Sequence, residues 1–449
     1  MNHTYYYSLI SKSLKFLIPE GKTLLYYGHY NSSIIPSLKP SYSICVSEEK
    51  NFDFLYKKKD YANISFVHSQ FQDYIPEKKF DYIVLDVAIG KTEDICYLLK
   101  NISKACYSHT RIIVHQENHL WQPLLKFAAL LGLKKKEKTK NWLSVGDVYS
   151  YLTTAGFEPI RPFNKNLFPV KMGFIGPLIN SISSFLPIFD FAKLDQFVIA
   201  RMLSLPEEDP STTICITVRD EEANIEPLIR SLPQICNNQE ILFVEGHSTD
   251  NTVQEIKRLQ LMFPEKNIRL IHQPGTGQGD AIRIGFLKAK GDIIVLYEGD
   301  GTSDPSDIQY FYECIKNGRY EFIEGSRFSY PIVSESMPLL NKIGNIIFAK
   351  WFSLFLKQRT TDVLSGIKAI TRKNFVAIYN TWGFLDVYDP FGDFELLYGS
   401  LRYGLKIGEI PIRYKPRVHG ASKTRFFKHG SYLIKMAWKG YFVFRNSKF

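Results

Sequence analysis

Three apolar segments of this chain each end in acidic residues, and this repeated placement constrains the fold more than any other feature. The segments read TTICITV, EILFV and DIIVLY, and the acids at or just after their ends are Asp220, Glu221, Glu245, Glu298 and Asp300. In a mostly parallel sheet, ligands bind outside the carboxyl ends of the strands. The pattern therefore predicts an α/β fold in which these acids meet at one edge and form a metal-assisted diphosphate site.

The length of 449 residues is more than one hydrophobic core usually serves, so we expect two domains. The polar stretch SLPEEDP at residues 204–210 is the best linker candidate because it holds two prolines. We predict a first domain at 1–204, a linker at 205–210, a second domain at 211–423 and a further segment at 424–449. Both domains alternate apolar runs with helical patterns, which predicts Rossmann-like α/β architecture with largely parallel sheets.

The composition indicates a globular protein with a phosphate-bearing partner. Hydrophobic residues make up 45% and charged residues 22% of the chain, so neither a disordered nor a fibrous class is indicated. The formal net charge of +11 suits a nucleotide, a nucleic acid or an anionic membrane surface. Nothing besides the charge favours a nucleic acid, so we expect no nucleic-acid partner.

No segment has the pattern of a signal peptide or a membrane span. The start, MNHTYYYSLISKSLKFLIPEGK, lacks a basic stretch followed by a long apolar one. Residues 173–189 carry no charge, but prolines and an asparagine interrupt them, and they fall short of the roughly 20 apolar residues that a span needs. This stretch remains a candidate for contact with a bilayer or a partner. The six cysteines form no CxxC pair, so we expect buried thiols in a reducing cytoplasm.

The first domain shows five apolar runs typical of strands, KTLLYYG, SYSICVS, ISFVHS, FDYIVLDV and RIIVHQ, followed by a late one, QFVIARML. Together with FDYIVLDVAIGKTEDICYLLKNI and NWLSVGDVYSYLTTAGFE, this order resembles the class I S-adenosylmethionine-dependent methyltransferases over about residues 20–203. The resemblance implies a Rossmann-like fold and S-adenosylmethionine as the cofactor.

Most residues that such a methyltransferase uses to hold its cofactor are replaced in this chain. The turn after the first strand, YYGHYNSS, keeps Gly28 only. The replacements are Tyr26 and Cys45 for the two acids, and Tyr30 and Ser32 for the other two glycines. A tyrosine where the backbone should approach the cofactor costs room, so we favour a structural or docking role and keep methyltransferase activity as the alternative. Asp86, at the end of the fourth strand, is a candidate catalytic residue, but we favour a solvated acid there.

The acids of the second domain suit a diphosphate and a cation. Asp220 to Asn224 open a helix, whose N-terminus favours anions, although acids there are also common as helix caps. Glu298 and Asp300 stand one residue apart, so they can share a divalent cation that also bridges the diphosphate oxygens. Hard oxygen ligands fit Mg²⁺ or Mn²⁺.

Seven strings in order resemble the family 2 glycosyltransferases of GT-A fold, in their dolichol-phosphate mannosyltransferase-like branch, from about Thr212 to His429. They are TVRDEEANI, VEGHSTDNT, EGD, EGSRF, TTDVLSGIKAI, GDFELLY and GEIPIRYKPRVHGASK. The resemblance implies that the first two strings bind the nucleotide and that EGD is the metal-binding DxD. Glu298 replaces the first Asp of that motif, which makes Asp300 the surer metal contact.

The resemblance also implies the residues that bind the nucleotide sugar. They are Val218, Asp220, Glu221, Glu245, Gly279, Arg283, Glu298 and Arg327. The glycine-rich QPGTGQGDAIRIG resembles a loop that lies over the donor, yet Thr276 and Gln278 stand where basic residues are frequent. Arg283 and Arg327 are the candidates to supply the missing positive charge.

The family reaction displaces a nucleoside diphosphate from the anomeric carbon in one step, usually with inversion. A glycan acceptor needs a carboxylate base, for which the candidates are Asp393 first, then Asp362 and Glu395. A polyprenyl phosphate acceptor is already an anion and needs a basic clamp instead, for which the candidates are Arg417, Lys423 and Arg425. The sequence leaves both acceptors open.

The C-terminal stretch TRFFKHGSYLIKMAWKGYFVFRNSKF mixes basic and aromatic residues and is too charged to span a bilayer. It fits either a basic amphipathic segment in a membrane interface or a helix packed on the catalytic domain. Membrane contact would place the protein at the inner face of the plasma membrane.

Two other classes compete with a glycosyltransferase. A sugar nucleotidyltransferase shares the acidic strand ends, but it carries a Gly-rich basic loop after its first strand, which TVRDEEANI lacks. A non-catalytic scaffold or nucleotide-binding protein of a surface-polysaccharide system is the second alternative, and the intact Asp300 and TDVLSG argue against it.

Overall fold

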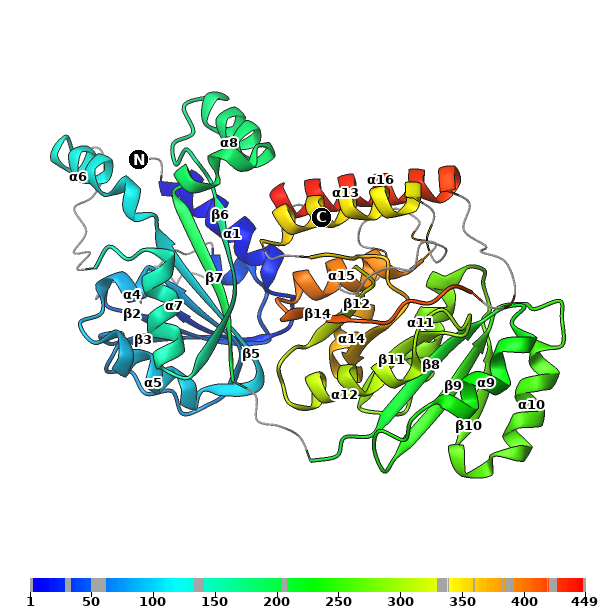
Figure 1. Ribbon diagram of the computed structural model, residues 1–449. Coiled ribbons are helices and arrows are strands. Elements are labelled where there is room, and N and C mark those ends of the chain that lie inside the picture. Colours follow the sequence, from blue (N-terminus) through cyan, green and yellow to red (C-terminus); the bar gives the residue numbers. More distant parts are fainter. Residues whose placement is uncertain are drawn as a thin grey trace. The chain divides into compact units, whose positions relative to one another are not determined.

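The computed structural model describes residues 3–28, 34–49, 62–132, 141–203, 208–328, 337, 339–357, 360–381, 383, 389, 391–417, 419 and 426–446. The chain divides into two compact units (Figure 1). The first holds Met1–Leu203 with Phe442–Phe449, and the second holds Ser204–Tyr441. Each unit is built on one seven-stranded sheet, as the alternating pattern of strands and helices predicts.

The sheet of the first unit has the order β3-β2-β1-β4-β5-β7-β6. Its strands are β1 (Thr23–Tyr27), β2 (Tyr42–Ser47), β3 (Ile64–His68), β4 (Phe80–Asp86), β5 (Cys106–Glu117), β6 (Phe157–Lys165) and β7 (Asp195–Met202). The first five run parallel, and β7 pairs antiparallel with both β5 and β6. The order reverses between β1 and β4, which is the point where doubly wound sheets bind their ligands.

The strand β6 at the edge of this sheet is absent from the sequence prediction. Its sequence, FEPIRPFNK, holds two prolines, which cannot donate to a ladder and which argue against a central strand. An edge strand tolerates them because only one side must pair, and β6 pairs with β7 alone. The register shift between Pro159 and Arg161 lies beside the first proline.

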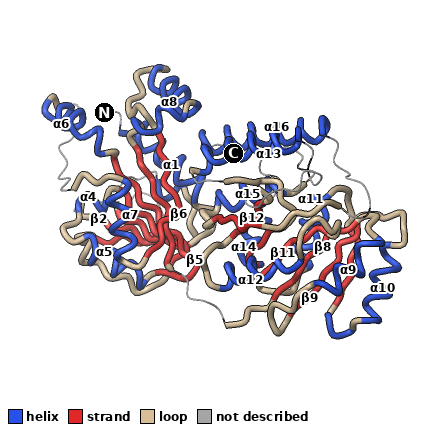
Figure 2. The backbone as a smooth tube through the Cα atoms, viewed as in Figure 1, coloured by secondary structure: helices blue, strands red, loops and turns tan. Residues whose placement is uncertain are grey.

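Helices α5 and α7 lie against the first sheet, whereas α6 and α8 project beyond it (Figure 2). The helices of this unit are α1 (His3–Leu17), α2 (Ile34–Ser37), α4 (Ala88–Lys91), α5 (Ile95–Lys104), α6 (Gln122–Leu130), α7 (Val145–Thr154) and α8 (Ile175–Phe185), with short 3-10 turns η1 (His119–Trp121) and η2 (Pro187–Ala192). Helix α7 begins with a capping box, because Ser144 and Asp147 each bond the backbone N–H of the other. Buried residues of α5 and α7 join the strands in one hydrophobic core.

The sheet of the second unit has the order β10-β9-β8-β11-β13-β12-β14. Its strands are β8 (Thr212–Val218), β9 (Gln239–Glu245), β10 (Ile268–His272), β11 (Ile293–Glu298), β12 (Phe322–Ser326), β13 (Lys368–Thr371) and β14 (Ile407–Pro411). Strand β13 alone is antiparallel to its neighbours β11 and β12. The order reverses between β8 and β11, so the acids after these two strands lie on either side of the switch point.

The helices of the second unit are α9 (Glu222–Ser231), α10 (Thr252–Met262), α11 (Gln278–Lys288), α12 (Ile308–Lys316), α13 (Leu339–Leu356), α14 (Arg372–Tyr379), α15 (Asp393–Arg402) and most of α16 (Phe426–Asn446), with 3-10 turns η3 (Pro264–Lys266) and η4 (Pro305–Asp307). The last residues of α16, from Phe442 on, belong to the first unit. A core of buried side chains joins β8, β9 and β11 to α9, α10 and α12. Within the described ranges, every helix is too short or too polar to cross a membrane.

The six cysteines are free thiols, but not all of them are buried. Cys45, Cys106, Cys215 and Cys236 are buried, whereas Cys314 is half-buried and Cys96 is exposed. The prediction of burial is therefore wrong for Cys96. This residue lies on the outer side of α5, whose inner side carries the buried Leu98, Leu99 and Ile102.

Candidate functional site

The acidic ends of β8, β9 and β11 lie side by side in the second sheet. Parallel pairing sets Val218 opposite Glu245 and Thr217 opposite Glu298. The next residues along the chain, from Asp220 and from Asp300, leave the sheet at the same edge. The convergence predicted from the sequence is thus present in the register of the strands.

Several of these acids hold the neighbouring turns together. Asp220 has a left-handed backbone (φ 49°), and its Oδ1 accepts the backbone N–H of Thr249 over 2.7 Å. Glu245 accepts from the backbone N–H of Ser248 and, over 2.8 Å, from Nδ1 of His272. Burial opposes ionisation of Glu245, but these hydrogen bonds outweigh it and lower its pKa. Asp220 and Glu245 therefore stabilise the turns that follow β8 and β9.

Asp300 and Glu221 share one guanidinium group. Arg417 donates from Nη2 to Oδ2 of Asp300, and from Nη1 to Oε1 of Glu221 over 3.2 Å. The other oxygen of Asp300 accepts the backbone N–H and the hydroxyl of Thr302, over 3.0 and 2.7 Å. Asn224 donates to Oε2 of Glu221 over 2.6 Å. Glu221, which follows β8, and Asp300, which follows β11, are thus linked by the guanidinium group of Arg417.

The predicted acceptor clamp of Arg417, Lys423 and Arg425 is only partly visible. Lys423 and Arg425 lie outside the described residues. Arg417 contacts Glu221 and Asp300, which the sequence predicts as ligands of the nucleotide sugar and the metal, so its neighbours are not those of the predicted acceptor clamp.

Glu298 is held between the glycine-rich loop and β13. Gln278, the first residue of α11, donates to its Oε1 over 2.6 Å. A Cβ atom at Gly366 would collide with the Glu298 carboxylate, so the site needs glycine there. Burial and the nearby charge of Asp300 raise the pKa of Glu298 to about 7. Gln278, one of the two residues predicted to stand in place of a basic residue, thus binds Glu298.

A fully buried lysine joins two more acids beside this group. Lys368 of β13 lies 2.9 Å from Oε1 of Glu324 and 3.3 Å from Oδ1 of Asp393. Burial opposes the charge of Lys368, but the two carboxylates outweigh it and raise its pKa. Burial raises the pKa of Glu324 and of Asp393 to about 7, and the charge of Lys368 offsets this effect only in part.

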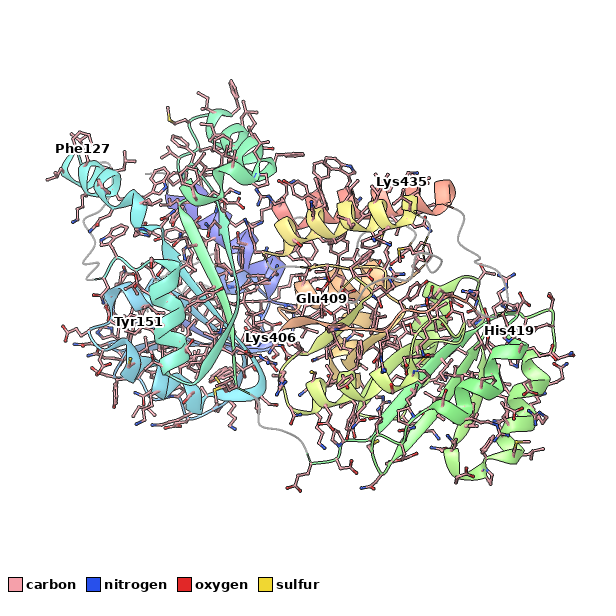
Figure 3. The ribbon with its side chains drawn as sticks, in the orientation of Figure 1. Phe127, Tyr151, Lys406, Glu409, His419 and Lys435 are labelled. Carbon is pink, nitrogen blue, oxygen red and sulfur yellow. The ribbon has the colours of Figure 1, made fainter. Side chains whose placement is uncertain are left out.

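Asp362 forms a bidentate pair with Arg327. Nε and Nη2 of Arg327 donate to its two oxygens over 2.6 and 2.9 Å, and Asp362 has no exposed surface. Burial opposes ionisation, but Arg327 outweighs it and keeps the pKa of Asp362 low. Glu409 of β14, labelled in Figure 3, accepts the backbone N–H groups of Thr361 and Asp362 over 2.7 and 3.2 Å. The predicted donor-site Arg327 and the predicted base Asp362 therefore neutralise each other.

The first turn of α15 carries the remaining predicted bases. Asp389 accepts the backbone N–H groups of Phe391, Phe394 and Glu395 over 3.0 to 3.2 Å, so it caps this helix. Glu395 is 3% exposed, and its Oε2 has no hydrogen-bond partner among the described residues. Burial raises the pKa of Glu395 to about 7. The sequence prediction missed Asp389, which lies three residues before the N-cap Gly392 and so outside the usual capping position.

The glycine-rich loop meets the start of α15 without side chains between them. A Cβ atom on Gly279 would lie 2.6 Å from the carbonyl oxygen of Asp389 and 3.1 Å from the nitrogen of Gly392. Gly392 has a φ of 77°, which favours glycine. Arg283 pairs with Asp280, whose other oxygen accepts the backbone N–H of Gly275 over 2.7 Å. Arg283 thus steadies this loop.

The oxygen donors around Asp300 fit a hard divalent cation. Carboxylates are the ligands that Mg²⁺ and Mn²⁺ prefer, so a cation bound by Asp300 and Glu221 would take the place that the Arg417 guanidinium holds between them. No group of three or more His, Cys, Asp or Glu side chains is arranged to hold a metal in the part of the chain that the structure describes. Mg²⁺ usually binds one or two carboxylates together with substrate phosphates and water, so Asp300 fits a cation shared with a diphosphate.

In the first unit, the carboxyl ends of β1, β4 and β5 are joined by a chain of buried polar groups. The hydroxyl of Tyr26 donates to Asp86, whose other oxygen lies 2.5 Å from Nδ1 of His115. Nε2 of His115 lies 3.2 Å from Oδ1 of Asp195, and the hydroxyl of Tyr6 donates to the same oxygen over 2.7 Å. Asp86 is 3% exposed, so the prediction of a solvated acid is wrong: Tyr26 and His115 bind its carboxylate inside the fold.

These side chains fill the place where a doubly wound sheet binds its ligand. A Cβ atom on Gly28 would lie 2.8 Å from the Tyr26 ring and 2.8 Å from Cβ of Asp86. Cys45 pairs with Tyr26 across the strands and is buried. The described residues of this unit therefore do not fit S-adenosylmethionine.

Comparison with known proteins bears on the second unit. Residues 213–377 match the family model described as Glycosyl transferase family 2. Glycosyltransferase AglJ of Haloferax volcanii is 27% identical over 183 residues, which are 40% of this chain and 55% of the relative, so the chain spans about half of that protein. The UDP-N-acetylglucosamine–dolichyl-phosphate N-acetylglucosaminyltransferase of Methanococcus voltae is 28% identical over 214 residues, 44% of this chain and 84% of the relative.

Two further likenesses cover about half of the chain each. The dolichol-phosphate mannosyltransferase of Pyrococcus furiosus is 26% identical over 239 residues, which are 51% of this chain and 64% of that relative. Among solved structures, glucosyl-3-phosphoglycerate synthase from Mycobacterium tuberculosis aligns with 53% of this chain and 81% of its own, at 16% identity and a TM-score of 0.38.

Proposed function

We propose, from the glycosyltransferase family 2 domain at residues 213–377, that the second unit transfers a sugar from a nucleoside-diphosphate sugar to a polyprenyl phosphate. In this proposal the domain has the GT-A fold. The acceptor oxygen attacks the anomeric carbon, the nucleoside diphosphate leaves, and the configuration at that carbon is inverted in the single displacement.

The proposed binding site for the nucleoside-diphosphate sugar is supported by three acids, Asp300, Glu298 and Glu221, which lie together at the carboxyl ends of β8 and β11. Asp300 would hold Mg²⁺ or Mn²⁺, which neutralises the charge that develops on the leaving diphosphate. Val218, Asp220 and Glu245 position the turns that would face the nucleotide.

The state of the three predicted bases favours an anionic acceptor. Asp362 forms an ion pair with Arg327, Asp393 forms one with Lys368, and Glu395 is buried, so none of the three carboxylates is free to accept a proton from a glycan. A glycan hydroxyl needs an accessible carboxylate to take its proton, whereas a phosphate does not. The Methanococcus and Pyrococcus relatives are named for dolichyl-phosphate acceptors, which agrees with this choice.

A transfer assay with Mn²⁺ and a panel of nucleoside-diphosphate sugars tests this function. We expect product with a short-chain polyprenyl phosphate and none with the uncharged polyprenol or an oligosaccharide. Asp393→Asn should keep turnover within about tenfold, because no general base is required. A loss of about 10²- to 10⁴-fold in that variant, with transfer to the oligosaccharide by the parent chain, would assign Asp393 as the base and a glycan as the acceptor. Absence of transfer with every donor would favour the scaffold alternative.

For the first unit we propose a methyltransferase-type fold with a structural role. The reversal of strand order at β1 and β4 supports the fold, and the buried chain from Tyr26 to Asp195 supports the role. Methyltransferase activity remains the alternative, and it requires that S-adenosylmethionine displace these side chains.

The first unit should lose stability as the pH rises from about 6.5 toward 10. Burial alone would lower the pKa of His115, but Asp195 and Asp86 raise it to about 10. The imidazolium therefore stabilises the folded unit fully below about pH 6.5, the unfolded pKa, and this contribution, at most about 5 kcal/mol, is lost as the pH rises through 10. Chemical denaturation followed across this range should show the loss in the parent chain and a flatter profile in His115→Gln. In the same samples, calorimetric binding of S-adenosylmethionine would contradict the structural role.

A further inference from the structure

Helix α13 of the second unit exposes an apolar face. Leu339 and Leu340 are 71% and 63% exposed, and Ile343 and Ile347 follow on the same side of the helix. The opposite side is buried and includes Phe352, whose ring lies 5.2 Å from that of Phe394 on α15. The helix is thus fixed by its inner side, while large aliphatic side chains face outward.

Helix α16 adds to this face. Figure 1 shows α13 and α16 running alongside each other, and the rings of Trp351 and Trp438 lie 5.1 Å apart. The hydroxyl of Tyr398 on α15 donates to the carbonyl of Met436 over 3.4 Å, so α16 also has a fixed inner side. The apolar platform consists of Leu339, Leu340, Ile343, Ile347, Ile434 and Trp438, all of which are exposed.

The charged residues of the two helices that carry the apolar platform are all positive. Neither α13 nor α16 contains an Asp or a Glu. Lys350, Lys435 and Lys439 are exposed on these helices, and Figure 3 labels Lys435 on α16. The whole chain carries a net charge of +11. An apolar strip edged by lysines matches the acyl boundary and the anionic headgroups of a bilayer, because lysine stems can lie along apolar surface while their charges reach the headgroups.

We propose that the apolar platform lies in the interface of an anionic bilayer and holds the second unit on the membrane surface. The role of this membrane binding rests on the proposed function. A polyprenyl phosphate is embedded in a bilayer, so an enzyme bound to the membrane through α13 and α16 meets its acceptor there. Surface docking needs no helix that spans the bilayer.

Flotation of the full chain with vesicles, without any nucleotide sugar, tests the proposal. We expect binding to vesicles of phosphatidylcholine with phosphatidylglycerol and weaker binding to phosphatidylcholine alone. The variant Leu340→Glu/Ile347→Glu should lose at least about tenfold in partitioning, because two large apolar side chains no longer enter the interface. Lys435→Gln/Lys439→Gln should lose about fivefold for each lysine, and high salt should abolish the difference from the parent chain.

Leu261→Glu is the matched control, because Leu261 on α10 is 86% exposed and lies outside the apolar platform. It should bind vesicles like the parent chain. Equal binding by Leu340→Glu/Ile347→Glu and Leu261→Glu would overturn the proposal. So would a parent chain that stays off vesicles and forms a dimer that Leu340→Glu/Ile347→Glu converts to a monomer, since the apolar platform would then bind a second copy.

The vesicle-binding experiment and the transfer assay can fail independently of each other. Leu340 and Ile347 are remote from Asp300 in sequence and take part in none of the donor-site contacts described above, so their variant should still use a water-soluble short-chain acceptor. Vesicle binding without any transfer would leave the membrane proposal standing and overturn the proposed function. Transfer to the soluble acceptor by a parent chain that does not bind vesicles would overturn the membrane proposal and leave the proposed function standing.

Discussion

Replacement of Asp300 by asparagine is expected to lower turnover about a thousandfold. The carboxylate of Asp300 would hold the divalent cation, and such a cation contributes several kcal/mol to stabilising the charge of the leaving group. Each 1.36 kcal/mol corresponds to a factor of ten in rate. Asparagine keeps an oxygen for the two hydrogen bonds from Thr302, so the loop after β11 should retain its shape. The measurement is kcat with Mn²⁺, together with the Mn²⁺ dependence of nucleoside-diphosphate binding.

The opposite end of the same strand provides the control. Asp292 lies just before β11, is exposed, and accepts from the hydroxyl and the backbone N–H of Ser211. Asp292→Asn removes the same charge from the same strand and should leave kcat unchanged. If Asp300→Asn behaved like Asp292→Asn in both turnover and diphosphate binding, Asp300 would not be the metal residue.

Lys368→Met should destabilise the second unit by about 3–5 kcal/mol, which is the usual cost of removing one partner from a buried ion pair. Methionine fills a similar volume, so the loss arises from charge and not from a cavity. Glu324 and Asp393 would then lie buried without a cation between them. The free energy of unfolding from denaturant titration measures the effect.

The pH dependence of the same variant gives a second readout. Without Lys368, the folded unit favours the protonated forms of Glu324 and Asp393 even more than it does at their present pKa values of about 7. Their unfolded pKa values are about 4, so stability is lost as the pH rises above 4, and the deficit of the variant should be larger at pH 8 than at pH 5. Lys415→Met removes a mostly exposed pair with Asp304 and should cost at most about 1 kcal/mol. If Lys368→Met and Lys415→Met lowered the free energy of unfolding equally, the buried ion pairs of Lys368 would stabilise the fold no more than an exposed pair does.

The placement of the acidic strand ends was predictable because it follows from local rules. Apolar runs mark the strands, and parallel strands bring their carboxyl ends to one edge. Glu245, Glu298 and the Asp300 loop can therefore be grouped from the amino-acid sequence alone. Partners could not be assigned in this way, because Arg417 reaches Asp300 from more than a hundred residues further along the chain.

The buried pairs escaped sequence reasoning for a related reason. Lys368 and Glu324 each interrupt an apolar strand, in GIKAI and FIEGS, which is the one local sign that they are charged residues inside the core. Their pairing depends on β13 lying antiparallel to β12, a long-range arrangement that no spacing reveals. Asp86 was misjudged in the same way, since its partners Tyr26 and His115 come from other strands.

The close approach of Gly279 and Gly392 ties the glycine-rich loop to the first turn of α15, because a Cβ atom on Gly392 would lie 3.0 Å from the α-carbon of Gly279. A methyl group at either position therefore cannot be added without moving one segment away from the other. Alanine at Gly279 or Gly392 would change the distance between the loop and the turn that carries Asp393, although neither glycine has a side chain of its own.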